Sequence, residues 1–419
     1  ADGRLFIRAE IGGDKPNAKL HIVVADPADG TIVADELLPA GMRKVRTEIA
    51  TRAEHLWSPN DPYLYDVTAT LEFGAAKSQG KQEKLQQESQ EIQEKPAKSQ
   101  EKQDIVRSYC AFRTVEIKPD LKGIARFHLN GKPVFLKGVL DQGYWPDGLL
   151  TAPSDEALVH DIIAMKESGF TMLRKHIKVE PMRWYYHCDR LGMLVWQDMP
   201  SGGGQYNLLT ISAPLITGIH LKDSHYRLFA RTDAQGREDF TRELTELITQ
   251  LQNCPCIVLW VPFNEGWGQF DAKNAVRLIR RLDPTRLIDH ASGWHDQGVS
   301  DVKSLHVYFK PYRFRPDKKG RAVVLSEFGG YNLPVAGHTW NTKNFGYKGY
   351  QTPEALGEAV KTLYETQIIP ARRAGLAADV YTQLSDVEDE VNGFVTYDRR
   401  VEKLPEALMQ AIAQELRGD

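Results

Sequence analysis

The sequence is poor in cysteine for its length. Four cysteines among 419 residues are too few for a disulfide scaffold in a chain of this size. Cys254 and Cys256 flank a proline, but no second pair follows at the spacing of a zinc site, so we interpret them as structural. Cysteine usage therefore leaves the redox compartment open.

A strong charge of one sign and a long hydrophobic run are also missing. The 53 Lys and Arg nearly balance the 56 Asp and Glu, whereas proteins that bind nucleic acids or anionic membranes carry a basic surface. The longest apolar run, residues 256–263, is far shorter than the ~20 residues that cross a bilayer. The first residues contain no basic region followed by an apolar stretch, which predicts either a cytoplasmic protein or one whose signal segment was removed. We expect a soluble protein with no nucleic-acid or membrane partner.

Residues 1–119 are predicted to form a small all-β sandwich, because the composition is that of a folded protein and the pattern there is strand-like. Alternation with β-branched residues, separated by turn signals, recurs at residues 5–11, 20–26, 31–38 and 63–73. No helical period occurs among these segments.

A low-complexity segment, residues 77–103, interrupts this domain. It holds six Lys and five Glu, is rich in Gln, and contains only Leu85 and Ile92 as large aliphatic residues. Such a composition buries too little apolar surface to offset the entropy of ordering, so we interpret it as a long hairpin insertion. An exposed single helix supported by Lys/Glu pairs is the alternative. The strand pattern resumes at residues 104–117.

From about residue 120 to residue 419 the pattern changes to alternating strands and helices. Several strand candidates are continuous apolar runs, as a parallel sheet requires. Eight are expected, at residues 134–140, 171–176, 192–198, 256–264, 287–292, 304–309, 322–328 and 379–385. Helices are expected after most of them, but residues 293–303 are predicted to be a loop. An eight-stranded βα-barrel is the simplest account. A doubly wound open sheet is the alternative, although no Gly-rich phosphate fingerprint follows the first strand.

Two glutamates stand at the C-terminal ends of predicted barrel strands, where the active site of such a barrel lies. Glu265 ends the fourth strand and Glu327 the seventh. Paired carboxylates flanking a cleft perform glycoside hydrolysis, one protonating the leaving oxygen and the other attacking or activating water. Either glutamate alone is more often a helix-terminal charge or a surface ion-pair partner. Their pairing favours catalysis.

Other side chains at the same strand ends are candidates for binding an oligosaccharide or glycoside. The polar candidates are Asp141, Gln142, Arg174, His176, Asp198, Asn264 and Tyr308, and His306 lies on the same sixth strand as Tyr308. The aromatic candidates, whose flat faces suit the apolar faces of sugar rings, are Trp145, Trp267, Trp294 and Trp340. We interpret Trp196 and Trp260 as core, and His176 and Tyr308 taken alone are more often structural. No His-x-x-x-His motif or clustered acidic loop occurs, so neither a metal nor a cofactor is predicted.

Long motifs in one order resemble glycoside hydrolase family 2, the family of β-galactosidases, β-glucuronidases and β-mannosidases. NEGWGQFD at residues 264–271 is similar to the acid/base motif of that family, and SEFGG at residues 326–330 to its nucleophile motif. LWSPNDPYLYDV and FRTVEI resemble the end of its immunoglobulin-like domain, and LNGKPVFLKGV, CDRLGMLVWQDMP and SDVEDEVNGFVTYDRR resemble segments of its barrel. The resemblance implies an immunoglobulin-like sandwich followed by a TIM barrel.

The sequence also departs from the family pattern around the sugar pocket. Leu140-Asp141-Gln142-Gly143 stands where Asn-Arg-His-Glu is common, and the usual Arg-x-x-His is Arg174-Lys175-His176 here. A tryptophan of the eighth strand is replaced near Tyr381. The N-terminal jelly-roll domain of the family is missing, so the chain is expected to be part of a longer enzyme.

The resemblance implies a retaining, exo-acting β-glycosidase with Glu265 as acid/base and Glu327 as nucleophile, and a β-galactoside is the first expectation for its substrate. It further implies that Asn264 contacts the sugar 2-hydroxyl, while Tyr308 and Arg174 orient Glu327. Alternatives are a non-catalytic carbohydrate-binding protein or inactive fragment on the same barrel, and an adhesion or scaffold module. The residues do not decide the sugar, the linkage, the compartment or whether the chain forms a homo-oligomer.

Overall fold

The computed structural model describes residues 3–12, 17–41, 44–73 and 103–417, and these fall into two compact units. One comprises Ala1–Leu56 with Tyr63–Phe112, and the other Trp57–Pro62 with Arg113–Asp419. The predicted insertion at residues 77–103 lies outside the described residues, except for Gln103, which begins a strand.

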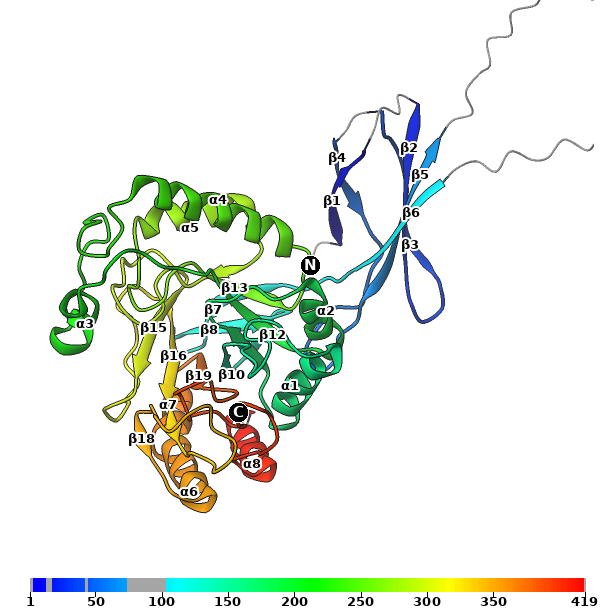
Figure 1. Cartoon of the computed structure of the whole chain (residues 1–419). Coiled ribbons are helices and arrows are strands. Elements are labelled where there is room, and N and C mark those ends of the chain that lie inside the picture. Colours follow the sequence, from blue (N-terminus) through cyan, green and yellow to red (C-terminus); the bar gives the residue numbers. More distant parts are fainter. Residues whose placement is uncertain (1–2, 13–16, 42–43, 74–102, 418–419) are drawn as a thin grey trace, which may run out of the picture. The chain divides into compact units, whose positions relative to one another are not determined.

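The first unit contains two antiparallel sheets (Figure 1). β1 (Arg4–Glu10) pairs with β4 (Lys44–Ala50), and the other sheet has the order β3 (Ile32–Pro39), β2 (Ala18–Ala25), β5 (Tyr65–Phe73), β6 (Gln103–Cys110). Leu20, Ile22 and Val24 alternate along β2 and are buried with Val45 and Ile49 of β4. This alternation is why the segments form strands with one face in an apolar core. Only β4 was not predicted, because charged residues separate its two buried side chains.

The second unit is built on eight parallel strands, which confirms the predicted TIM-like barrel. Their order is β14 (Leu287–Ile288), β13 (Ile257–Val261), β12 (Leu194–Asp198), β11 (Met172–Lys175), β10 (Leu136–Asp141), β19 (Ala378–Thr382), β16 (Ala322–Gly329), β15 (Val302–Val307). Most of these strands are buried along their whole length, as the apolar runs predicted. Within the described residues no strand pairing joins β14 to β15, so the ring of eight strands is closed everywhere except between these two.

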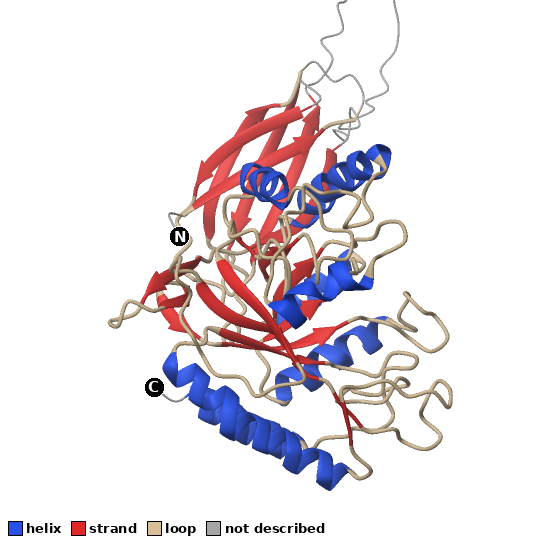
Figure 2. Cartoon of the chain, turned by 90° about the vertical axis from the view of Figure 1, so that its left-hand side faces the viewer, coloured by secondary structure: helices blue, strands red, loops and turns tan. Residues whose placement is uncertain are grey.

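Helices follow most of the barrel strands (Figure 2), but in the described part of the chain none lies between β14 and β15 or between β15 and β16. The predicted ones are α1 (Asp155–Glu167), α2 (Met182–Leu191), α4 (Ala234–Leu251), α5 (Ala272–Leu282), α6 (Pro353–Leu363) and α8 (Glu406–Arg417). A π-helical turn, Tyr364–Ile368, continues α6 into α7 (Ile369–Ala374). Ser154 caps α1 as expected, its hydroxyl accepting from the Ala157 amide at 3.2 Å. The segment between β14 and β15 is a loop, as predicted.

α3 (Leu208–Thr217) was not predicted. It contains Pro214, and several of its apolar side chains are exposed rather than gathered on one buried face, so it lacks the periodic signal of an amphipathic helix.

Short strands complete the second unit. β7 (Val115–Pro119), which the sequence pattern assigned to the sandwich, pairs with β8 (Ala125–Leu129), and β8 pairs with β9 (Lys132–Val134). β17 (Tyr331–Asn332) pairs with β18 (Lys348–Gly349) beyond the end of β16. None of the helices in the described part of the chain has the length and apolar character needed to cross a membrane.

Candidate active site

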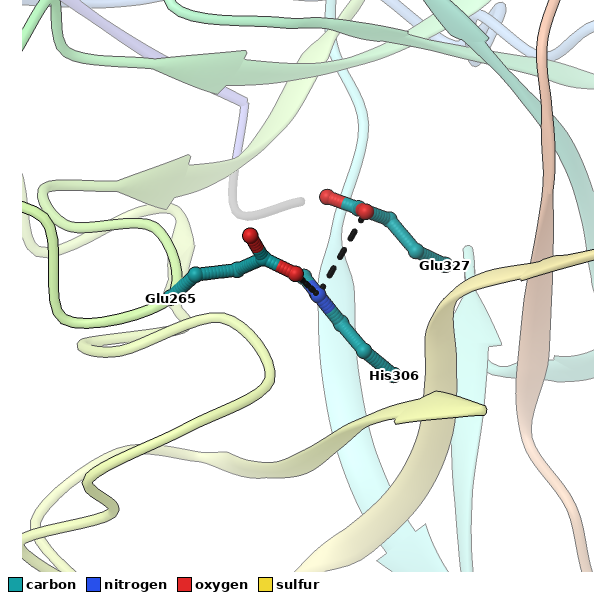
Figure 3. Close-up of side chains that lie close together, drawn as sticks. All are labelled: Glu265, His306 and Glu327. Atoms are coloured by element: carbon teal, nitrogen blue, oxygen red, sulfur yellow. Dashed lines mark hydrogen bonds and ion pairs between the residues drawn. The ribbon is translucent and has the colours of Figure 1, made fainter. Parts of the chain in front are cut away.

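The two glutamates singled out in the sequence lie together at the barrel mouth. Glu265 follows β13 and Glu327 lies near the end of β16, and their side chains point toward one another (Figure 3). One oxygen of each carboxylate and Nδ1 of His306 all lie within 4.8 Å of one another. Both glutamates are mostly buried, with 16% and 7% of their side chains exposed. Two carboxylates in such proximity are chemically unusual, so their surroundings decide their charge.

Arg174, at the inner face of β11, donates hydrogen bonds to four other residues of the site. Its Nη1 donates to Oε1 of Glu327 at 3.0 Å and to the Ser326 carbonyl at 3.0 Å. Its Nε and Nη2 donate to Asp198 at 3.1 and 2.9 Å, and Nη2 also donates to Oδ1 of Asn264 at 2.8 Å. All five N–H groups of the guanidinium are thus engaged. The fully buried cation is fixed in one orientation.

Glu327 is held as a carboxylate by donors on both of its oxygens. Oε1 accepts from Arg174, and Oε2 accepts from the hydroxyl of Tyr308 at 2.5 Å. The Tyr308 ring stacks on Tyr347 with centroids 3.7 Å apart. Burial, with the charge of Glu327, raises the pKa of Tyr308 well above its ordinary value, so this hydroxyl keeps its proton and remains a donor. Both oxygens of Glu327 therefore accept hydrogen bonds from fixed donors.

Glu265 has the opposite environment. Burial raises the pKa of Glu265 above its ordinary value. Its Oε2 accepts from the indole of Trp267 at 3.2 Å, and its Oε1 lies 2.7 Å from Nδ1 of His306. Among the described residues, the side-chain hydrogen bonds of Arg174 go to Glu327, Ser326, Asp198 and Asn264, and none goes to Glu265. The two carboxyl groups therefore have different electrostatic surroundings.

Asp198 and Asn264 extend the polar cluster. Asp198 accepts from Arg174, and Nδ1 of His176 lies 2.9 Å from its Oδ2. Burial alone would raise the pKa of Asp198, but Arg174 and His176 outweigh it and hold that pKa below its ordinary range. Because Oδ1 of Asn264 accepts from Arg174, the amide nitrogen of Asn264 is oriented away from that bond and can donate to a substrate hydroxyl.

A second polar group at the mouth joins Gln142 to residues after β19. Nε2 of Gln142 donates to Oε1 of Gln383 at 2.7 Å and to Oε2 of Glu390 at 3.0 Å. Nε2 of Gln383 also donates to Oε2 of Glu390, at 2.6 Å. Burial, reinforced by the nearby charge of Glu327, raises the pKa of Glu390. Gln383 and Glu390 were not predicted as site residues, although Gln383 lies in the predicted eighth strand at residues 379–385 and Glu390 in the motif at residues 385–400.

His306 was also missed as a site residue, although a signal for it existed. Tyr308 and His306 are two residues apart on one strand, so their side chains share a face. The His306 side chain is completely buried, and burial lowers its pKa to about 3. It lies between the two glutamates in Figure 3, 2.7 Å from Oε1 of Glu265 and 3.4 Å from Oε2 of Glu327.

The donor types of Glu265, His306 and Glu327 would also suit a divalent cation. The contacts given above already account for the cluster, since Arg174 supplies a positive charge on Glu327 and His306 is hydrogen-bonded to Glu265. A hydrogen-bonded acid–histidine–carboxylate group needs no ion to hold it together.

The structure places Asp141 away from this cluster. Its Oδ2 accepts from Nζ of Lys175 at 2.7 Å, and Lys175 lies over the Trp184 ring of α2. Lys175 also donates to Glu180 at 2.8 Å, and Lys178 pairs with Glu180 at 2.9 Å. Asp141 therefore faces the helix layer and not the barrel interior, because side chains alternate along β10.

The predicted aromatic residues have different surroundings. Trp145 is 5% exposed and Arg399 covers one face of its ring at 3.9 Å, which leaves little surface for a sugar. Trp340 is 49% exposed and meets Tyr397 edge-on. Trp267 contacts Glu265, and Trp294 lies 6.4 Å from the His306 ring. Trp196 and Trp260 are fully buried, as predicted for core residues.

The backbone around Glu265 is strained, as is common at functional sites. Glu265 has φ of 51°, in the left-handed region that a side chain rarely adopts. Its amide donates to the Ser292 carbonyl at 2.8 Å. Gly266 follows at φ of 76°, where an added Cβ would lie 2.7 Å from the His295 ring. The turn thus holds the Glu265 carboxylate at the barrel mouth, and only glycine fits at position 266.

Comparison with known proteins identifies the family of the barrel. The family model described as "Glycosyl hydrolases family 2, TIM barrel domain" matches residues 120–403. A β-galactosidase of Yersinia enterocolitica is 26% identical over 260 residues, which are 61% of this chain and 20% of that protein. A β-galactosidase of Priestia megaterium is 24% identical over 269 residues, 64% of this chain and 22% of that protein. The chain spans about a fifth of the length of these curated relatives.

Solved structures share the fold at low sequence identity. The crystal structure of a Parabacteroides merdae β-glucuronidase has a TM-score of 0.66 at 16% identity, covering 99% of this chain and 50% of that one. A putative β-galactosidase from Bacteroides fragilis also has a TM-score of 0.66, at 17% identity, with 99% and 58% covered.

Proposed function

The chain belongs to glycosyl hydrolase family 2, and on that premise we propose that it hydrolyses β-glycosides from the end of the sugar chain with retention of configuration. The observation that carries the proposal is the close approach of Glu265 and Glu327, within 4.8 Å. Retaining glycosidases hold their carboxyl groups ~5–5.5 Å apart, whereas inverting ones need ~6.5–9.5 Å to admit a water. The separation supports a covalent intermediate.

In the first step Glu265 protonates the glycosidic oxygen. The bond between C1 and that oxygen breaks, its electron pair leaves with the alcohol, and a carboxylate oxygen of Glu327 forms an ester bond to C1. In the second step Glu265 takes a proton from water, the water oxygen bonds to C1, and the ester electrons return to Glu327. Arg174 and Tyr308 hold Glu327 ionised and aimed, which pre-organises the attack.

The sugar itself would be recognised by the polar groups around the two glutamates. Asn264 would donate to the 2-hydroxyl, where bonds strengthen in the transition state. His176, Gln142 and Glu390 stand at the same mouth and offer hydrogen bonds to further hydroxyls. Trp267, Trp294 and Trp340 are partly exposed and remain the proposed aromatic contacts.

The charge of the mouth favours a neutral sugar over a uronic acid. All donors of Arg174 are engaged, and the buried Lys175 pairs with Asp141 and Glu180 in the separate cluster that faces the helices. Glu390 adds a carboxyl to the mouth instead of a cation. A sugar carboxylate would meet like charge there, so a β-galactoside is the first substrate we propose.

The all-β unit would be the immunoglobulin-like domain that accompanies this barrel in the family. Its two antiparallel sheets around one apolar core support that assignment.

Trapping the intermediate tests the proposal. Glu265→Ala should still form the glycosyl-enzyme from a 2,4-dinitrophenyl β-galactoside, because that leaving group needs no proton, but should hydrolyse it slowly. Added azide should restore turnover and yield a β-glycosyl azide. Mass spectrometry of the trapped enzyme should find the sugar on the peptide that carries Glu327.

The results test the roles of the two glutamates, the stereochemistry and the sugar class separately. Sugar on the Glu265 peptide would reverse the two roles, and an α-configured azide product would contradict retention. A parallel panel of neutral and uronic dinitrophenyl glycosides decides the sugar class independently of the roles.

A further inference from the structure

His306 is the one ring in the site that contacts both glutamates and has no evident place in the two-step mechanism. Nδ1 faces Glu265 at 2.7 Å and Glu327 at 3.4 Å. Nε2 lies 3.0 Å from the hydroxyl of Ser292. An added Cβ on Gly293 would lie 2.5 Å from the ring, so the backbone packs directly on it. The position of the ring is fixed, and its function depends on which nitrogen carries the proton.

A chain of three serine hydroxyls decides that question. Ser326 on β16 donates to the carbonyl of Leu305 at 3.4 Å, and Ser304 donates to Ser326 in a short hydrogen bond. Ser292 and Ser304 are joined at 3.4 Å. A carbonyl only accepts, and each hydroxyl has one proton to donate. With the protons of Ser326 and Ser304 already committed, the contact between Ser292 and Ser304 is a hydrogen bond only if Ser292 donates it.

The same argument shows which nitrogen of the His306 ring carries the proton. Since the proton of Ser292 is committed, its oxygen accepts from His306, and Nε2 carries the ring proton. Burial lowers the pKa of His306 to about 3, so the ring has only that one proton near neutral pH. Nδ1 is then a bare acceptor directed at the two carboxyl groups. Glu327 has donors from Arg174 and Tyr308 on its oxygens and brings no proton. Only a protonated Glu265 satisfies the 2.7 Å contact.

We propose that His306 is a positioning residue that keeps the catalytic acid Glu265 protonated, with Nδ1 accepting a hydrogen bond from the protonated Oε1. This rests on the proposed function, in which Glu265 is the acid. In the first step the proton turns from His306 to the glycosidic oxygen. In the second step the lone pair of Nδ1 faces a Glu265 carboxylate and makes it a stronger base toward water. His306 acts in both steps through Glu265 and does not touch the sugar.

The surrounding charges agree with one proton on this pair. Arg174 on β11 and Tyr308, directly after β15, donate to Glu327, and His176 pairs with Asp198, the other carboxylate partner of Arg174. Asp289 is also buried at the end of β14, and burial raises its pKa to about 7. Apart from their contact with each other, the carboxylate that Glu265 and His306 meet among the described residues is that of Glu327, whose Oε2 lies 3.4 Å from Nδ1 of His306.

The pH dependence of catalysis tests the proposal in His306→Ala. Water would enter the vacated space and solvate the carboxylate, and the acceptor for the acid proton would be lost. Both changes lower the pKa of Glu265, so the alkaline limb of kcat/KM should move down by about one pH unit. Turnover of a methyl β-glycoside should fall ~10- to 100-fold, while the dinitrophenyl glycoside, which needs no acid, should lose much less in its first step.

His290→Ala is the matched control. His290 is also a buried histidine after β14, hydrogen-bonded to Ser300 at 2.7 Å and to the Gln297 amide at 2.7 Å, but it contacts neither glutamate. It should lose comparable stability with its alkaline limb unchanged. An unchanged or upward-shifted limb in His306→Ala would overturn the proposal, and so would equal losses for the two leaving groups.

A direct measurement needs no turnover. In enzyme labelled with ¹⁵N-histidine, the signals that disappear in the His306→Asn variant belong to His306, and their shifts report the tautomer. We expect a protonated Nε2 and a bare Nδ1 near neutral pH. A protonated Nδ1 would overturn the proposal even in an active enzyme, whereas the expected tautomer in an enzyme without glycosidase activity would place the fault in the proposed function instead.

Discussion

The two units of the chain differ in what they bury. In the all-β unit the described core is apolar, with side chains such as Leu20 and Ile22, and its ion pairs lie at the surface, as between Arg4 and Glu48. Every buried charged or polar side chain of the described residues lies in the barrel unit, between Lys137 and Lys403. Buried ion pairs add little net stability compared with apolar packing. The difference therefore indicates which unit carries chemistry.

The same contrast recurs within the barrel, on two neighbouring residues of β11. Arg174 and Lys175 are both fully buried cations with two carboxylate partners. Lys175 and Lys178 face Asp141 and Glu180, so the charges of the outer cluster balance. Arg174 faces Asp198 and Glu327, so the inner cluster has more carboxylates than fixed cations. A balanced cluster is structural, and an unbalanced one leaves a carboxylate available for reaction.

The largest effect is expected from Glu327→Gln. An amide cannot form the ester to C1, so kcat should fall on the order of 10⁵-fold or more for every leaving group. The circular dichroism spectrum and the melting temperature should stay close to those of the unchanged protein, because Gln fills the same space. Measurable turnover with a dinitrophenyl glycoside would contradict the role of Glu327 as the nucleophile.

Substituting the two neighbouring cations sharpens the comparison. Arg174→Met and Lys175→Met should each destabilise the fold by about 3–5 kcal/mol, because each leaves buried carboxylates without their cation. Only Arg174→Met should also reduce kcat/KM, by about 10³-fold for the folded fraction, since Glu327 and Asn264 lose their orientation. Urea unfolding and kinetics on the same preparations measure both effects. Equal kinetic losses in the two variants would contradict the division into inner and outer clusters.

The smallest effect is expected in the all-β unit. Glu72 of β5 pairs opposite Gln103 of β6, so the two strand ends are neighbours and a short Gly-containing turn can join them. Replacing residues 77–101 by such a turn should change the free energy of unfolding by no more than about 1 kcal/mol, because loop-closure entropy depends weakly on length. Thermal unfolding of both forms measures this. A larger loss would show that the charged segment contributes packing, contrary to its composition.

Much of the fold could be predicted because parallel barrel strands are buried on both faces and appear as apolar runs. β4 and α3 were missed for the corresponding reason. Val45 and Ile49 of β4 are isolated among charges, and α3 exposes Leu208 and Leu209, so neither segment has a clear periodic pattern.

The sequence by itself determined the order of strands and the two glutamates at the ends of the fourth and seventh. These follow from local periodicity and from the rule that barrel sites lie at strand ends. Only the tertiary structure decided which neighbours complete the site. Arg174 finds its partners 24, 90 and 153 residues away along the chain, and His306 finds Glu265 at 41. Side chains alternate between the two faces of a strand. Asp141 therefore faces the helix layer, whereas Gln142, the next residue, faces the barrel mouth. Such contacts depend on the closing of the sheet, which no local pattern encodes.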